Sequence, residues 1–314
     1  MSLEDELKNF SPVGDTLLTV GVFDGVHCGH QKLLSELAGE AKKKHFSSGV
    51  ITFASHPQSR LGSTNAPALL TSNEDKIALI KRLNATFVVS LDFSTELAHT
   101  SAREFCALLQ KHLHMKGLVL GFDFAMGHNR EGSLDKMELL GKEMGFTTAI
   151  VPPVIIDGNT VSSTAIRHLI SEGKVKQAAN MLGRNYSLKG LVVTGKKLGQ
   201  KLGFPTANIP IDPAFSIPSE GIYATVAIID GERWDSVTNI GTAPTFNRVD
   251  SLIEVHILDF DQPLYGKYLQ IEFIERIRSE LTFPSESALK NQIAKDIKNT
   301  KIILKKNTEG KSCP

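Results

Sequence analysis

Apolar and polar residues follow two different rhythms along the chain. Before residue 180, short β-branched runs predict strands at residues 17–22, 49–53, 87–91, 118–120 and 147–151. Between them, apolar residues spaced three and four apart predict helices at residues 31–44, 74–83, 102–114 and 134–145. This order of strand, crossover helix and strand predicts a Rossmann-like α/β domain, with a parallel sheet covered by helices on both faces.

The rhythm changes after two further predicted helices at residues 164–171 and 175–182, which Gly173 and Gly183 are expected to end. Strands are predicted at residues 188–194, 221–229, 236–240, 252–260 and 268–276, with no helix between them. This spacing indicates an antiparallel β-barrel, and residues 285–298 are expected to form a terminal helix against it. We therefore predict domains at residues 1–185 and 186–304, followed by a polar, frayed tail at residues 305–314.

Composition limits the kinds of partner. The 314 residues include 35 basic and 34 acidic ones, so the formal charge of +1 gives no long-range field for nucleic acid or an anionic membrane. The start of the chain lacks the features of a signal peptide, and no apolar run approaches the roughly 18 residues of a membrane helix. Three distant cysteines predict neither a disulfide framework nor a zinc ribbon. The expectation is a cytoplasmic protein that binds no nucleic acid and no membrane.

The first candidate loop, GVFDGVHCGH at residues 21–30, lies between a predicted strand and a predicted helix. Glycines allow close backbone approach to a ligand, and the N-terminus of the helix favours phosphate. His27 and His30 are expected to donate to phosphate oxygens whose charge grows as pyrophosphate leaves. Two alternatives are a zinc site that includes Cys28 and a helix cap on an ordinary surface loop.

The second candidate loop, GKKLGQKLGFPTANI at residues 195–209, interleaves three lysines with three glycines. Cationic donors beside permissive backbone are typical of polyphosphate binding, although the glycines alone would also suit a flexible turn. Strand alternation further downstream places Glu254 on the same face as His256. An ordinary solvated strand carboxylate is the alternative for Glu254.

These motifs resemble those of bacterial bifunctional riboflavin kinase/FAD synthetases, whose first module belongs to the nucleotidyltransferase superfamily. The resemblance continues through TFASHP (52–57), GFDFAMGHNREG (121–132), VSSTAIR (161–167), LGFPTANI (202–209), NIGTAPTF (239–246), IEVHILDF (253–260) and PLYGK (263–267). The Phe-Pro-Thr-Ala-Asn string is its most specific element. The resemblance implies a two-activity enzyme that phosphorylates riboflavin with ATP to FMN, and then adenylylates FMN with ATP to FAD and pyrophosphate.

The resemblance also implies residue roles in the first module. His27 and His30 would be catalytic, and Asp123, Gly127 and Arg130 would bind the flavin phosphate. The positions expected to bind ATP there are Gly21, Phe23, Asp24, Gly29, Ser162, Ser163, Thr164 and Arg167. Asp123 is alternatively a turn-former, and the Ser162–Thr164 run could simply cap a helix. Met126 stands where the family usually has Phe, a change that is expected to weaken flavin stacking.

In the second module the resemblance makes Glu254 the catalytic base, with Thr206 and Asn208 as ligands of Mg²⁺ on ATP. Gly195, Gly199, Lys201 and Gly203 would bind ATP, and Arg278 would bind the flavin, although a surface ion pair would also explain Arg278. Lys196 and Gln200 replace the more frequent Asp and Arg near the expected phosphates, and these changes are expected to alter the affinity for ATP.

Other functions are less well supported by the same residues. The alternatives are a chain with kinase activity alone, an adenylyltransferase for another phosphorylated small molecule such as phosphopantetheine, and a non-catalytic flavin sensor or redox flavoprotein. The SSTAIR and FPTAN strings disfavour the second, and the third has no redox cysteine pair. The expected ligands are therefore riboflavin, FMN, FAD and ATP, bound by a monomer or a weak homo-oligomer.

Overall fold

The computed structural model describes residues 2–55, 66–128, 131–195, 198–245 and 248–307, with only the backbone at residues 198, 242–245 and 248–251. The chain folds into two compact units, Met1–Ser163 and Thr164–Pro314. Each is an independent layer structure, as the change of rhythm in the sequence predicts.

The first unit is built on a five-stranded parallel sheet with the strand order β3-β2-β1-β4-β5. Its strands are β1 (Thr16–Val20), β2 (Ser47–Phe53), β3 (Phe87–Leu91), β4 (Met115–Gly121) and β5 (Thr147–Val151). The predicted parallel sheet is confirmed. The order reverses between β1 and β4, so this is the topological switch point at which open α/β sheets bind ligands.

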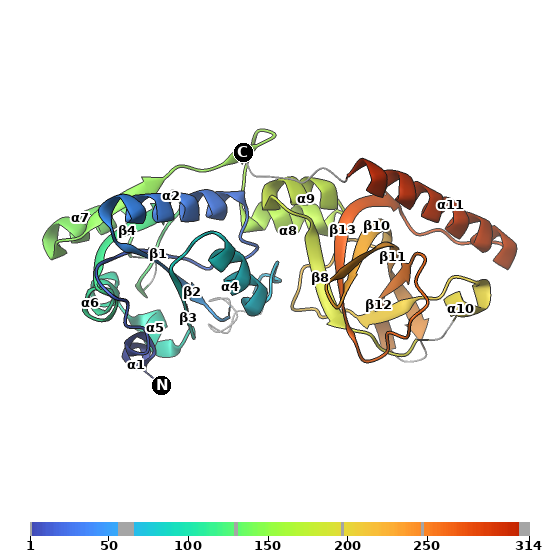
Figure 1. Ribbon diagram of the computed structural model, residues 1–314, viewed down its shortest axis with the longest axis horizontal. Helices are drawn as coiled ribbons and strands as arrows, with labels where there is room; N and C mark the ends of the chain where they lie inside the picture. Colours follow the sequence, from blue (N-terminus) through green and yellow to red (C-terminus); the bar gives the residue numbers. More distant parts are fainter. Residues whose placement is uncertain (1, 56–65, 129–130, 196–197, 246–247, 308–314) are drawn as a thin grey trace. The chain divides into compact units, whose positions relative to one another are not determined.

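Successive side chains along the strands point to opposite faces of the sheet and pack into two separate hydrophobic cores. Leu18 of β1 packs on one face with the helical residues Phe105 and Leu109, whereas its neighbour Leu17 packs on the other face with Leu34 and Leu37. Figure 1 shows α2 on one side of the sheet and α1, α5 and α6 on the opposite side. Both faces carry mostly apolar residues, which explains the nearly continuous rather than alternating apolar runs.

The helices of this unit are α1 (Leu3–Lys8), α2 (Cys28–Lys44), α4 (Asn73–Arg82), α5 (Thr95–His99), α6 (Ala102–Leu113) and α7 (Leu134–Met144). Serine side chains cap four of them, because Ser2, Ser72, Ser94 and Ser101 each accept the N–H three residues further on. The predicted start of α2 at residue 31 is wrong, since α2 begins at Cys28 and includes His30. A small hairpin, β6 (Ile155–Ile156) and β7 (Asn159–Thr160), precedes Ser163.

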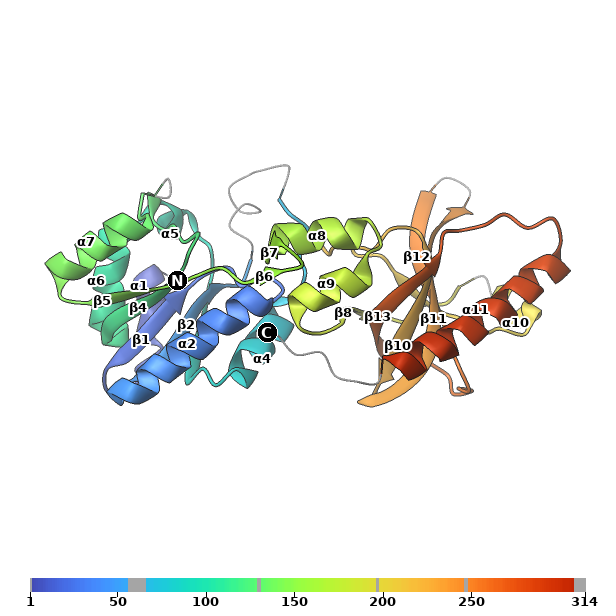
Figure 2. The ribbon, with the colours of Figure 1, turned by 90° about the horizontal axis from the view of Figure 1, so that it is seen from above.

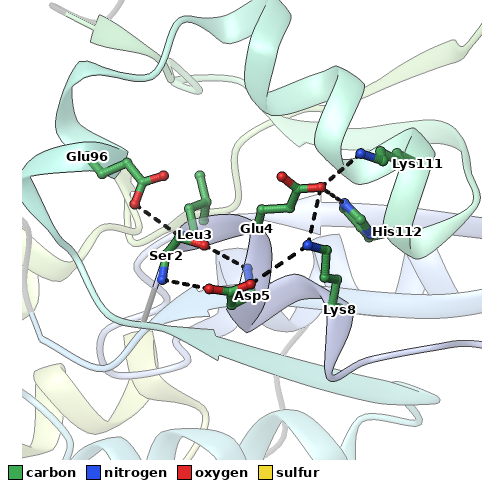
Figure 3. A network of polar contacts seen from close by, with 8 residues as sticks. All are labelled: Ser2, Leu3, Glu4, Asp5, Lys8, Glu96, Lys111 and His112. Carbon is green, nitrogen blue, oxygen red and sulfur yellow. Dashed lines mark hydrogen bonds and ion pairs between the residues drawn. The ribbon is translucent and has the colours of Figure 1, made fainter.

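Sequence patterns did not predict α1, which is held by an ionic network (Figure 3). The Glu4 carboxylate lies 2.8 Å from Lys111 Nζ, 3.0 Å from His112 Nε2 and 3.6 Å from Lys8 Nζ. Beneath these contacts Leu3 and Leu7 are buried. The short helix therefore gains its place from tertiary contacts with α6 rather than from its own length.

The second unit is a six-stranded antiparallel sheet in the order β8-β13-β10-β11-β12-β9. Its strands are β8 (Tyr186–Leu191), β9 (Ala207–Pro210), β10 (Gly221–Ile229), β11 (Glu232–Thr245), β12 (Arg248–Ile257) and β13 (Tyr268–Arg278). The N–H of Val193, just beyond β8, donates to Asn208 O of β9 at 2.9 Å. This bridge joins the chain that leaves the first strand of the sheet to its last strand, so the sheet curls into the predicted barrel.

Three helices accompany the barrel outside its long last helix, namely α8 (Ser163–Ser171), α9 (Val175–Leu182) and α10 (Leu198–Leu202). Gly183 ends α9 in the left-handed conformation, and Gly173 follows α8 with φ +73°, as predicted. Both helices were assigned to the first domain by the predicted boundary at residue 185. By contacts they belong, apart from Ser163, to the second compact unit.

The terminal helix α11 (Glu286–Lys306) lies against β10, β11 and β13 (Figure 2). The prediction that the chain frays from Lys305 onward is wrong for Lys305 and Lys306, which complete the last helical turn. Leu304 is buried there, and cations suit the negative end of a helix. Residues 308–314 of the predicted tail lie outside the described residues.

Of the cysteines, Cys106 is a free thiol in the core of the first unit, and burial raises its pKa to about 12. Cys28 is disulfide-bonded. The wide spacing of the cysteines in the sequence gave no sign of this bond.

Glu4 makes the docking of α1 pH-dependent. Its hydrogen bonds to Lys111 and His112, and the charges of Lys111 and Lys8, lower its pKa from 4.5 to about 2. A carboxylate whose pKa is depressed by folding stabilises the folded form above its unfolded pKa, and this stability is lost as the pH falls through the folded pKa. We expect the hydrogen-exchange protection of residues 3–8 to fall between pH 4.5 and about 2.

Glu4→Gln should lower that protection at neutral pH and remove most of its dependence on acid. Glu40→Gln is a matched control, since Glu40 pairs with Lys43 on its own helix at the protein surface and also has a lowered pKa. Protection of residues 3–8 that is unchanged in Glu4→Gln, or equally reduced in the control, would contradict this role.

Candidate functional site

The chain makes a strained turn where β1 ends. Within four residues, Phe23, Gly25 and Val26 all have positive φ angles of +51°, +80° and +39°. Such angles are costly for Phe and Val, and strain of this kind concentrates at ligand-binding turns. Phe23 is buried, and its ring meets the His30 ring edge-on at a centroid distance of 5.1 Å.

His27 and His30 are brought together by the helix start. His27 is the N-cap of α2, and its Nδ1 accepts the N–H of His30 at 3.3 Å. The two imidazoles are stacked, with centroids 3.6 Å apart. Because Nδ1 of His27 accepts, its neutral ring carries the proton on Nε2, a nitrogen that can donate to an anion. The capping alternative is thus part of the geometry, and it fixes the tautomer.

Asp24 holds the turn against a neighbouring segment. Its carboxylate accepts the N–H groups of Leu70 and Thr71 at 3.0 and 3.1 Å. Lys76 is buried close by and donates to the Phe53 carbonyl at the end of β2. Burial lowers the Lys76 pKa, and the Asp24 charge opposes this shift. Asp24 was expected to bind ATP, whereas these contacts give it a structural task that the sequence did not reveal.

The Ser162–Thr164 run reaches the same turn from the end of the unit. Ser163 Oγ donates to the Asp24 carbonyl at 2.9 Å. The Val161 carbonyl lies close to Gly29, where an added Cβ would be 3.7 Å away. The structure thus brings Ser163 beside the histidine turn. Thr164 and Arg167 lie on α8, in the second compact unit.

The predicted flavin loop follows β4, the neighbour of β1 across the switch point. Gly127 has φ +78° and lies so close to the Ala102 N–H that a Cβ would be 2.7 Å from it. The Ala102 N–H donates to Glu131 Oε1, which ties the loop to the start of α6. Asp123 is exposed in a turn, consistent with its turn-forming alternative. Arg130 lies outside the described residues.

Met126, where the family more often has Phe, closes this loop through its backbone. Its N–H and carbonyl both bond to Gly132, at 3.2 and 2.9 Å. Its side chain packs against the apolar core of the first unit. These contacts fix the positions of Met126 and Gly132 at the two ends of the loop.

In the second unit the strand register aligns the candidate side chains in one row. Asn208 of β9 is paired with Glu254 of β12, and Glu254 with Asn239 of β11. Asn239 is paired in turn with Ile222 of β10, and Ile222 with Arg278 of β13. Residues directly opposite one another point to the same face of a sheet. The structure thus places the predicted base and a predicted metal ligand side by side.

Glu254 lies on the partly exposed side of β12. Its neighbours in the strand, Ile253 and Val255, are buried in the barrel, whereas Glu254 and His256 are only partly buried. This is the alternation that the sequence predicts. The prediction of a loop through Asn208 is wrong, because Asn208 is a buried residue of strand β9.

Two glycines of the second loop leave space that other groups of the protein fill. The Asn208 amide occupies the space where a side chain of Gly195 would lie, and the Phe204 carbonyl does so at Gly199. The Phe204 N–H also donates to the Gly199 carbonyl at 2.8 Å. Gly203 has φ +87° in the turn after α10. These close approaches hold the loop against Thr206 and Asn208.

His256 is a site residue to which the sequence assigned no role. Its Nδ1 lies 2.8 Å from the carbonyl oxygen of Pro205. Because a carbonyl oxygen only accepts hydrogen bonds, Nδ1 must carry the proton and donate it to this oxygen. Its ring also meets Phe204 edge-on at 5.7 Å. His256 therefore holds the segment that carries Thr206. Its position two residues from Glu254 was the only available signal.

The remaining predicted positions are less central in the structure. Arg278 binds the buried Asp296 of α11, with its Nη2 2.7 Å from Oδ2, so its guanidinium ties the helix to the barrel. The ion-pair alternative is therefore present for Arg278, with Asp296 buried rather than at the surface. Lys201 and Gln200 are exposed on α10, and Lys196 lies outside the described residues.

Known protein families match the two parts of the chain separately. Residues 11–165 match the family model described as FAD synthetase, and residues 182–304 match the model described as riboflavin kinase. The chain is 38% identical over 289 residues to a Haemophilus influenzae protein named bifunctional riboflavin kinase/FMN adenylyltransferase, covering 91% of this chain and 94% of that one. Proteins of that name from Escherichia coli and Bacillus subtilis are both 36% identical, over 94% and 90% of this chain.

Among solved structures, a Streptococcus pneumoniae protein named macrolide-efflux protein has the same fold. It superposes with a TM-score of 0.86 at 30% identity, over 94% of this chain and 96% of its own. Within the part of the present chain that the structure describes, no helix has the length and apolar character needed to cross a membrane.

The hydrogen bonds of Asp24 generate a stability prediction. Asp24→Ala leaves the N–H groups of Leu70 and Thr71 without their acceptor, at a cost of about 1–3 kcal/mol for each buried group. We expect faster hydrogen exchange of the β1 and β2 amides in this variant. Asp123→Ala, which changes an exposed carboxylate on the neighbouring loop, should alter the free energy of opening by less than about 0.5 kcal/mol. Equal effects of the two substitutions would show that Asp24 is not an anchor.

Proposed function

The chain belongs to the bifunctional riboflavin kinase/FMN adenylyltransferase family, and we propose which of its residues carry the two reactions. It is an enzyme of FAD biosynthesis with ATP as co-substrate. The kinase reaction is assigned to the row of Asn208 and Glu254 in the second unit, and adenylyl transfer to the histidine turn of the first unit. The cross-strand pairing of Asn208 with Glu254 is the observation that most strongly supports this assignment.

In the kinase step, the terminal hydroxyl of riboflavin attacks the γ-phosphorus of ATP. A new P–O bond forms, the bond to the β-phosphate oxygen breaks, and ADP leaves. The hydroxyl must lose its proton, and Glu254 is the base proposed to accept it. Its side chain suits this task because it lies on the accessible face of β12, beside Asn208.

Thr206 and Asn208 are the residues proposed to hold Mg²⁺ on the phosphates of ATP. Both offer neutral oxygen atoms, and Mg²⁺ prefers oxygen ligands while drawing most of its coordination from phosphates and water. Asn208 is buried and braced by Gly195, so its amide is preorganised. The bound ion would neutralise charge on the phosphates. Gly199, Lys201 and Gly203 are proposed to line the ATP side of this loop.

In the adenylyl transfer step, a phosphate oxygen of FMN attacks the α-phosphorus of ATP and pyrophosphate leaves. The nucleophile is already an anion, so the step needs no base. It needs donors to the departing charge, and Nε2 of His27, the His30 imidazole and the N-terminus of α2 are proposed to supply them. Gly21, Phe23 and Gly29 would line the ATP side of the turn, with Ser162 as a further phosphate contact. Thr164 and Arg167 of α8 are proposed to bind ATP on the strength of the family resemblance alone.

FMN is proposed to bind at the loop after β4. This loop and the histidine turn follow adjacent strands at the switch point, so both reach the same edge of the sheet. Gly127 and Asp123 belong to this proposed flavin phosphate site, together with Arg130. Asp24 and Arg278 are proposed to act indirectly, by holding the turn and the terminal helix.

Replacement of His30 should separate the two activities. With riboflavin, ATP and Mg²⁺, His30→Ala is expected to form FMN at the unaltered rate and to form FAD at least about 10²-fold more slowly, since donors to a developing charge contribute on that scale. Chromatographic time courses of both products measure this. His45→Ala, at the opposite end of α2, is the control and should form both products normally.

Replacement of Glu254 should have the reverse effect. Glu254→Ala is expected to reduce FMN formation by about 10²–10⁴-fold, the range for loss of a general base. It should still convert supplied FMN to FAD. Glu232→Ala, at the exposed start of the neighbouring strand, controls for the loss of a strand carboxylate. Normal FMN formation by Glu254→Ala would refute the assignment of the base.

A further inference from the structure

Asn239 occupies the position between two carboxylates in the second unit. It is paired with Glu254 in the register of β11 and β12, and its Nδ2 lies 3.4 Å from Glu254 Oε2. The same amide also bonds to Glu280, which follows β13. Glu280 lies against Gly241, where it leaves no room for a side chain. One side-chain amide thus contacts carboxylates from two different parts of the chain.

The orientation of this amide is fixed by chemistry. A carboxylate accepts hydrogen bonds, so only the NH₂ end of Asn239 can face Glu254 and Glu280. Among the residues that the structure describes, the opposite end, Oδ1, is buried with no hydrogen-bond partner. A side chain that served only the stability of the barrel would be expected to satisfy both of its ends. The position of Asn239 is therefore explained by the two carboxylates.

The local charges make such an amide useful. Burial raises the pKa of Glu280, the carboxylates of Glu220 and Glu254 raise it further, and the Asn239 amide and Arg278 oppose the rise. Arg278 gives most of its donors to Asp296, so it only partly offsets the negative charge. His256, also on the Glu254 face of β12, donates to Pro205. Asn239 is the neutral group that contacts both carboxylates directly.

We propose that Asn239 is a positioning residue of the kinase reaction, which holds the Glu254 carboxylate in place by sharing one amide between Glu254 and Glu280. This rests on the proposed role of Glu254 as the base. By donating to both carboxylates, the Asn239 amide favours their charged forms although the two charges are alike. Without this amide, the two carboxylates would repel each other, and one of them would take up a proton at a higher pH.

The test is the dependence of kcat on pH for FMN formation from riboflavin and MgATP. Asn239→Ala should lower kcat about tenfold, a fraction of the ~10²–10⁴ that a general base contributes, with KM for both substrates nearly unchanged. The acid limb of its profile should move to higher pH. Glu280→Gln removes the competing charge, so alone it should move the limb to lower pH, and in Asn239→Ala it should move the limb back.

Asn185→Ala is the matched control. Asn185 Nδ2 donates to Glu272 Oε2, also at 3.4 Å and also partly buried, but away from the row of site residues. Its loss should leave both kcat and the acid limb unchanged. Conversion of supplied FMN to FAD should proceed normally in every variant.

An acid limb that does not move in Asn239→Ala, or that Glu280→Gln fails to shift in either background, overturns the proposal. A fall in kcat that Asn185→Ala reproduces also overturns it, because any lost amide contact would then suffice. These outcomes differ from failure of the proposed function, which would appear as normal FMN formation by Glu254→Ala.

Discussion

The register of the barrel strands is the constraint on which the proposed kinase site depends. Side chains alternate between the two faces of a strand, so a slip of one residue in β12 would turn Glu254 into the barrel and bring a valine or isoleucine to the surface. The buried residues Ile253 and Val255 prevent this slip. The same register sets Asn208 on one side of Glu254 and Asn239 on the other. Apolar packing in the interior thus determines polar geometry on the outer face.

In the first unit, the strand order brings the proposed site residues together. Because β1 and β4 are neighbours and their crossover helices go to opposite faces, the turns after these strands share one edge of the sheet. The turn after β1 is then fixed by side chains. Asp24 fastens it to residues 70–71, and His27 joins it to α2. A loop with three positive φ angles keeps its shape only when surrounding contacts determine it in this way.

The sequence was most informative where a residue type has one strong physical reason. The spacing of apolar residues along the chain predicted the sheet, the barrel and the long helices, and Gly183 marked the end of α9. It was least informative for short elements that depend on tertiary contacts. Helix α1 has a Ser2–Asp5 capping box but only six residues, and strand β9 is a four-residue strand that ends in Pro210. Neither could be recognised without its partners.

Side-chain assignments show the same limit. The sequence correctly placed Glu254 on the accessible face of its strand, because alternation is a local property. It could not give the partners of Asp24 or Arg278, which depend on long-range contacts with residues 70–71 and with Asp296. The glycines at 195 and 199 were expected to make room for phosphate. In the structure, Asn208 and Phe204 occupy the space beside their α-carbons, a distinction that residue type alone does not carry.

The different residues of the two proposed sites follow from the protonation state of their nucleophiles. A riboflavin hydroxyl is neutral and must lose a proton, so its site needs a carboxylate whose charge is maintained, and a carboxylate near phosphates needs neutral or cationic neighbours. Asn208, Asn239 and a metal ion meet that need without adding negative charge. The FMN phosphate is already an anion, so a base would only repel it. Imidazole donors and the N-terminus of a helix suit that reaction instead. The two steps therefore need different residues, which two separate units can provide better than a single pocket.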